Sequence, residues 1–166
     1  DMHDLELSDY YSGVGFRNEE LHKATVETAK KRYRMVADLG YKNVLIDEAS
    51  GNLPLPCGED DYVKIVAEGA NEMGLYAKSL GLTLSWHNHW GNIFETPEPF
   101  HKFVAQLDND LCGLCIDVGQ LKLGGYDEVD TVRRYVNRIK FMHYKDVTFA
   151  GRPQGQLYPG GPTVPT

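Results

Sequence analysis

The sequence predicts an α/β fold of the (β/α)8 TIM-barrel type, and three observations predict it. Four short apolar runs alternate with four helical segments along the 166 residues, a pattern typical of a parallel sheet covered by helices. The strand-to-helix turns carry no glycine-rich phosphate-binding fingerprint, which disfavours the dinucleotide-binding form of this class. Polar residues follow each apolar run at its C-terminal end, where a barrel enzyme keeps its active site.

The helices are expected at residues 19–39, at 60–80, after Thr96-Pro97 and at about 127–137. The first carries apolar side chains at helical spacing and stops at Gly40, while Thr96 and Pro97 are a typical N-cap and first helical residue. The apolar runs are "YKNVLIDEAS", "LTLSWHNHWGN", "LCGLCIDVGQ" and "RIKFMHYKDV". Residues 1–166 are expected to form a single domain, in which the Gly- and Pro-rich segment 150–166 is an irregular loop or tail.

Charge and cysteine content restrict the partners and the compartment. The formal net charge is -7, which disfavours a nucleic-acid partner. No apolar run reaches the length that spans a membrane, and no signal-peptide pattern opens the chain. Cys112 and Cys115 are spaced CxxC inside a strand-like run, so they should face opposite sides of the sheet, and we interpret them as buried thiols rather than as a zinc or redox pair. With Cys57 they make an odd number of thiols, which fits the cytoplasm.

The residues that suit a metal gather after the apolar runs. Glu48, His87, Asp117 and His143 end successive predicted strands, and carboxylates mixed with imidazoles bind divalent ions. Taken singly, each also has a structural interpretation, as a helix cap or a hydrogen-bonded core residue. His89 should share a face with His87, because residues two apart on a strand point the same way.

These motifs resemble the xylose-isomerase-like barrel superfamily of sugar isomerases, epimerases and inosose dehydratases, of which endonuclease IV is a distant member. The resemblance rests on "HNHWGN", "CIDVGQLKLGG" and "RIKFMHYKDV" and covers most of residues 19–148. It implies metal ligands at His87, Asp117 and His143, with a glutamate from a final strand. Many members have Glu in place of His87 and His in place of Gln120, so Glu48 is a candidate for the missing carboxylate.

A complete barrel has about 250 residues. The motifs match roughly strands four to seven, with "LELSDYY" as a remnant of strand three. We therefore expect an incomplete barrel, and an open one could associate with copies of itself.

The resemblance implies proton abstraction next to a carbonyl through an enediolate, assisted by Mn, Zn, Mg or Co. His89 and Lys145 are the candidates for proton transfer, and Asn88, Trp90 and Gln120 for contacts with a small sugar or polyol. The favoured function is an isomerase or epimerase. A lyase acting on a keto-polyol or keto-sugar and an inactive remnant or binding subunit are the alternatives.

Overall fold

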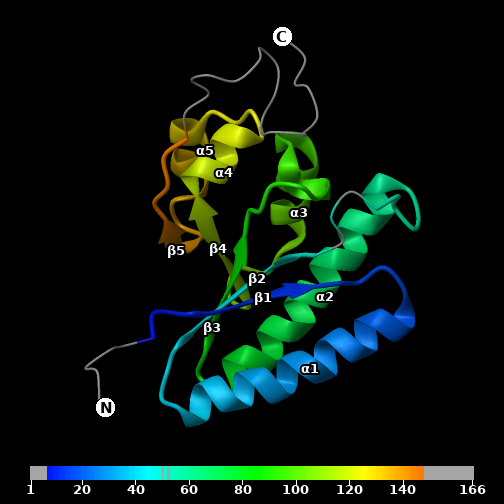
Figure 1. Cartoon of the computed structure of the whole chain (residues 1–166), viewed down its shortest axis with the longest axis vertical. Helices are drawn as coiled ribbons and strands as arrows, with labels where there is room; N and C mark the ends of the chain where they lie inside the picture. Colours follow the sequence, from blue (N-terminus) through cyan, green and yellow to red (C-terminus); the bar gives the residue numbers. More distant parts are fainter. Residues whose placement is uncertain (1–6, 50, 52, 148–166) are drawn as a thin grey trace.

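The computed structural model describes residues 7–49, 51 and 53–147, and contains a five-stranded sheet whose strands are all parallel. The strands lie side by side in the order in which they occur in the chain (Figure 1). Their bounds are β1 Tyr10–Val14, β2 Asn43–Glu48, β3 Thr83–His87, β4 Cys112–Asp117 and β5 Ile139–His143. The four strands expected from the apolar runs are therefore present. The fifth, β1, begins near the end of the segment expected to be a remnant strand and continues beyond it.

Helices connect each strand to the next, as the alternating pattern predicts. They are α1 Glu19–Asp38, α2 Glu59–Ser79, α3 Pro97–Gln106, α4 Val118–Leu123 and α5 Glu128–Tyr135, with a 3-10 turn, η1, over Ile93–Glu95. The first begins at Asn18, whose side chain accepts a hydrogen bond from the Leu21 amide. It ends before Gly40, which has a backbone φ of 82° that residues with a Cβ rarely adopt. Short polar and glycine signals thus fix where the long helices begin and end.

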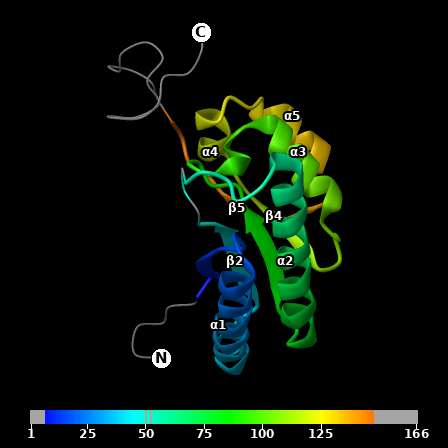
Figure 2. The same ribbon diagram turned by 90° about the vertical axis from the view of Figure 1, so that its right-hand side faces the viewer.

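The helices cover one face of the sheet. Figure 1 shows the two long helices α1 and α2 side by side, and Figure 2 shows α2 and α3 on the same side of β4. Val44 and Ile46 of β2 belong to the core between sheet and helices, together with Tyr33 and Tyr62. Because side chains alternate along a strand, Leu45 and Asp47 lie on the opposite face. We call that opposite face, which carries Asp47, His87, Cys115, Asp117 and His143, the inner face.

The sheet is open in the described part of the chain, with β1 and β5 at its two edges. Five parallel strands with helices outside correspond to part of a (β/α)8 barrel. The segment 150–166, expected to be irregular, lies outside the described residues. None of the helices in the described ranges is long and apolar enough to cross a membrane.

Candidate active site at the C-terminal edge of the sheet

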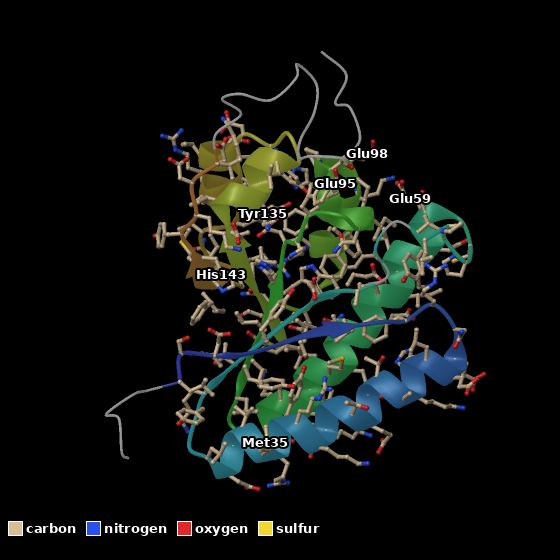
Figure 3. The ribbon with its side chains drawn as sticks, in the orientation of Figure 1. Met35, Glu59, Glu95, Glu98, Tyr135 and His143 are labelled. Carbon is tan, nitrogen blue, oxygen red and sulfur yellow. The ribbon has the colours of Figure 1, made fainter. Side chains whose placement is uncertain are left out.

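Four of the predicted site residues end neighbouring strands. Glu48 ends β2, His87 ends β3, Asp117 ends β4 and His143 ends β5. Because the strands are parallel, these ends lie at the same edge of the sheet, and Asp117 pairs in register with His143. His143 is labelled in Figure 3. Parallel order alone brings these residues to one edge, but it does not decide which face each side chain takes.

His87, Cys115 and His143 form a compact group on the inner face. One ligand atom from each lies within 4.8 Å of the other two, and the His87 and His143 ring centroids are 4.8 Å apart. Among the described residues, the Nδ1 atoms of both histidines are buried without a hydrogen-bond partner. Burial, and then the neighbouring His143, lower the pKa of His87 to about 4. His87 is therefore neutral near pH 7, which is the form that binds a metal.

Asp117 is fully buried beside this group, and both of its oxygens are engaged. Its Oδ1 accepts the backbone N–H of Gln120 at 3.0 Å, which caps α4. Its Oδ2 lies 2.6 Å from Lys145 Nζ and 3.7 Å from His143 Nδ1. Lys145, a candidate for proton transfer, reaches the site although β5 ends two residues earlier. The charged groups of this site are therefore the buried Asp117 carboxylate and the Lys145 ammonium, which belongs to a half-exposed side chain.

Asn88 and Gln120, predicted to contact substrate, hold the edge of the sheet together. The Asn88 side chain donates to the Asp117 carbonyl at 3.1 Å and accepts from the Asp117 amide at 2.8 Å. Gln120 Oε1 accepts the Trp90 backbone N–H at 3.0 Å. These bonds join the loop after β3 to the end of β4 and so position Asp117. Contact of Asn88, Trp90 or Gln120 with a substrate stays a prediction.

His89 lies just beyond β3, in the loop that also carries Trp90. Its ring centroid is 5.6 Å from that of His87. Its Nδ1 lies 2.6 Å from the Trp90 carbonyl oxygen, and because a carbonyl only accepts, Nδ1 carries the proton of that bond. In the neutral ring, Nε2 then has a lone pair available for a proton.

Glu48 lies at the expected edge but faces the helices rather than the histidines. Tyr62 of α2 donates its hydroxyl to Glu48 Oε1 at 2.9 Å. The expectation of a Glu48 ligand therefore needs correction, because Glu48 alternates with the inner-face residues of β2. Asp47 takes the inner face instead, in a hydrogen bond with Tyr11, and burial raises the pKa of its carboxyl.

Sequence reasoning missed two inner-face residues, Asp47 and Cys115. The two CxxC cysteines do face opposite sides: Cys112 packs in the core with the helices, and Cys115 meets the histidines. Both are free thiols, and burial raises the pKa of each to about 12. Cys115 stands two residues before Asp117, and this spacing was the available signal for a shared face.

Comparison with known proteins identifies the family of this fold. A family model described as "Xylose isomerase-like TIM barrel" matches residues 1–159. An inosose dehydratase of Clostridium perfringens is 32% identical over 160 residues, covering 89% of this chain and 52% of the relative. The structure of an E. coli 3-keto-D-glucoside 4-epimerase superposes with a TM-score of 0.72 at 15% identity, over 86% of this chain and 59% of that one.

A second solved structure, the IOLI protein with a bound zinc atom, has a TM-score of 0.67 at 17% identity over 88% of this chain and 55% of that one. At these identities the two structures establish the fold alone. The chain spans about half the length of the curated relatives that it matches. The predicted fold class is confirmed, and the chain belongs to the xylose isomerase-like TIM barrel family.

Proposed function

We propose that the protein containing this chain is a metal-dependent isomerase or epimerase of a small sugar or polyol. The observation that carries the proposal is the inner-face group of His87, Asp117, His143 and Lys145 at the C-terminal edge of the sheet. In it, Asp117 Oδ2 lies 3.7 Å from His143 Nδ1 and 2.6 Å from Lys145 Nζ, and the His87 and His143 ring centroids are 4.8 Å apart. A site that pairs imidazoles with a buried carboxylate and a cation suits proton abstraction next to a carbonyl.

The residues of the group fit a divalent metal. The Nδ1 atoms of His87 and His143 are buried without hydrogen-bond partners in the described part of the chain, and such nitrogens are costly unless something binds them. One ring nitrogen of each histidine lies within 4.8 Å of the other. His87, Asp117 and His143 would hold the ion, in line with the zinc of one structural neighbour. When bound, the metal would polarise the substrate carbonyl and stabilise the negative charge that develops on its oxygen.

The remaining groups supply proton transfer and orientation. His89 Nε2, with its lone pair available, would take the proton from the carbon next to the carbonyl. Lys145 would leave Asp117 and donate a charge-assisted hydrogen bond to a substrate hydroxyl or to the developing oxyanion. Returning the proton to a different carbon gives isomerisation, and returning it to the opposite face of the same carbon gives epimerisation.

A dehydratase is the second candidate, and the 32% identity to an inosose dehydratase favours it. The first step is the same proton abstraction, after which a hydroxyl on the neighbouring carbon leaves as water once it has taken up a proton. Lys145 would donate that proton, since its Nζ lies beside Asp117 and half of its side chain is exposed. The two candidates therefore share their residues and differ in product.

The test is to incubate the complete gene product in D2O with a panel of keto-sugars and keto-polyols and with Mn²⁺, Zn²⁺, Mg²⁺ or Co²⁺. NMR would follow deuterium entering the carbon next to the carbonyl. A deuterated product of unchanged composition supports the isomerase or epimerase, and loss of water identifies the dehydratase. His89→Gln should abolish the exchange, whereas His101→Gln, on α3, should leave it unchanged. Absence of exchange with every substrate and metal would leave a binding protein or an inactive barrel remnant.

A further inference from the structure

We propose that Cys115 is a ligand of the metal, and that its sulfur makes the site select zinc or cobalt over magnesium or manganese. The proposal rests on the proposed function, because it concerns the same metal. It differs from the ligand set that the family resemblance implies, in which the strand of Asp117 contributes only the carboxylate. The question is therefore which atom of β4 stands nearest to the two histidines.

The register of the sheet places the thiol against the histidines. Cys115 pairs across the sheet with His87, and on its other side β4 pairs with β5, which ends at His143. One potential ligand atom each from Cys115, His87 and His143 lies within 4.8 Å of the other two. Cys115 is 0% exposed. The sulfur thus belongs to the floor of the site, one step below Asp117 on the same face of β4.

The distances suit a tetrahedral ion. Zinc binds sulfur at about 2.3 Å and imidazole nitrogen at about 2.0 Å, so its ligand atoms stand about 3.5 Å apart. Side-chain rotations that move the three ligand atoms about 1 Å inward would meet that geometry. The fourth position would be open to Asp117 Oδ2 once its ion pair with Lys145 opens, and a substrate or water oxygen would add a fifth ligand, which catalytic zinc sites accept.

The carboxylate next to this group is already committed. Asp117 Oδ1 caps α4, and Oδ2 holds Lys145 at 2.6 Å. Until that ion pair opens, the sulfur is the third donor available to His87 and His143. Binding would release the thiol proton to solvent, with a metal–sulfur bond formed in its place.

The donor type sets the selectivity. Magnesium and manganese prefer oxygen ligands, whereas thiolate and imidazole together favour zinc and its substitute cobalt. No disulfide competes for Cys115 within the described residues, because Cys112 lies on the opposite face and Cys57 is exposed. The other cysteine of the same strand also provides a matched control, since Cys112 is as buried as Cys115.

The experiment is to titrate the 166-residue chain with Co²⁺ and record its absorption spectrum, because thiolate coordination gives an intense sulfur-to-cobalt charge-transfer band in the near ultraviolet. The band should appear in the unaltered chain, persist in Cys112→Ala and disappear in Cys115→Ala. X-ray absorption of the zinc-loaded, unaltered chain gives a second readout that needs no variant, and should show a scatterer at about 2.3 Å from zinc. In competition experiments the chain should bind zinc roughly 100-fold or more tightly than magnesium, because zinc prefers the softer sulfur donor.

The outcomes separate this proposal from the proposed function. Cobalt or zinc bound with only nitrogen and oxygen neighbours would overturn the Cys115 ligand and leave the metal-dependent reaction standing. A charge-transfer band that survives in Cys115→Ala would overturn it as well. If neither the chain nor the complete gene product binds cobalt or zinc, both the Cys115 ligand and the metal site of the proposed function are wrong. A sulfur-ligated metal in a protein that exchanges no substrate hydrogen would uphold Cys115 and refute the proposed function alone.

Discussion

Replacing Tyr62 by Phe tests whether Glu48 is part of the helix–sheet packing rather than of the metal site. Tyr62 is 0% exposed and Glu48 only 2%, and the hydroxyl donates to the Glu48 carboxylate at 2.9 Å. The substitution keeps the ring, so it opens no large cavity, but it removes a buried hydrogen bond to a carboxylate, which contributes about 2 kcal/mol. For a chain of this size that loss lowers the melting temperature by roughly 4–8 °C.

Thermal unfolding followed by circular dichroism measures this change. Tyr76→Phe is the matched control, because Tyr76 lies on the same helix and is only partly buried against the core. Its melting temperature should stay within about 2 °C of the unaltered chain, as expected when no buried hydrogen bond is lost. Glu48→Gln retains an acceptor for Tyr62 and should leave zinc affinity unchanged. A Tyr62→Phe chain that melts like the control, or a Glu48→Gln chain that loses zinc, would refute the placement of Glu48.

Three further predictions concern charge, pH and assembly. Lys145→Met should leave the metal content unchanged by elemental analysis but abolish substrate deuterium exchange. It should also destabilise the metal-free chain by about 1 kcal/mol, because Asp117 stays buried without its partly exposed partner. Lost metal or retained exchange would contradict this. Burial, and then Arg134, lower the pKa of His101, which lies 2.6 Å from the hydroxyl of Tyr135 (labelled in Figure 3). The stabilising contribution of His101 is therefore present above its unfolded pKa of about 6.5 and is lost as the pH falls below that value. Urea titrations should show that His101→Gln loses less stability than the unaltered chain between about pH 7 and pH 5. Equal losses would show that His101 is not responsible. The isolated chain should associate through the edges of β1 and β5, which have no partner strand among the described residues. A sedimentation coefficient that stays monomeric as concentration rises would count against this.

The long helices could be predicted from the sequence because their signals are local. The period of apolar residues located α1 and α2, and Gly40 and Gly81, with φ of 82° and 71°, marked where they end. The short helix α4 was missed, since six residues are too few to display a period. The sequence offered Asp117 both as a possible metal ligand and, taken singly, as a helix cap, and the structure shows its capping bond to the Gln120 amide.

The site could be predicted only as far as the edge of the sheet on which it lies. Parallel strands bring their C-terminal ends together, so the positions of His87, Asp117 and His143 followed from the order of elements. The face of each side chain did not follow for β2, because Val44, Leu45 and Ile46 are all buried and both faces of the strand are apolar. Packing against Tyr62 of α2 decided that Glu48 turns outward, and that contact joins residues 14 positions apart.

Calorimetric titration of the chain with Zn²⁺ tests the central claim most directly, because it asks whether the inner-face histidines bind a metal at all. We expect a single zinc per chain, with binding lost in the variant His87→Ala/His143→Ala and retained in His22→Ala/His101→Ala, which removes two histidines placed on helices α1 and α3. Circular dichroism of each variant would show that the fold persists. Equal zinc binding by both double variants, or none by the unaltered chain, would contradict a metal centre at the C-terminal edge of this sheet.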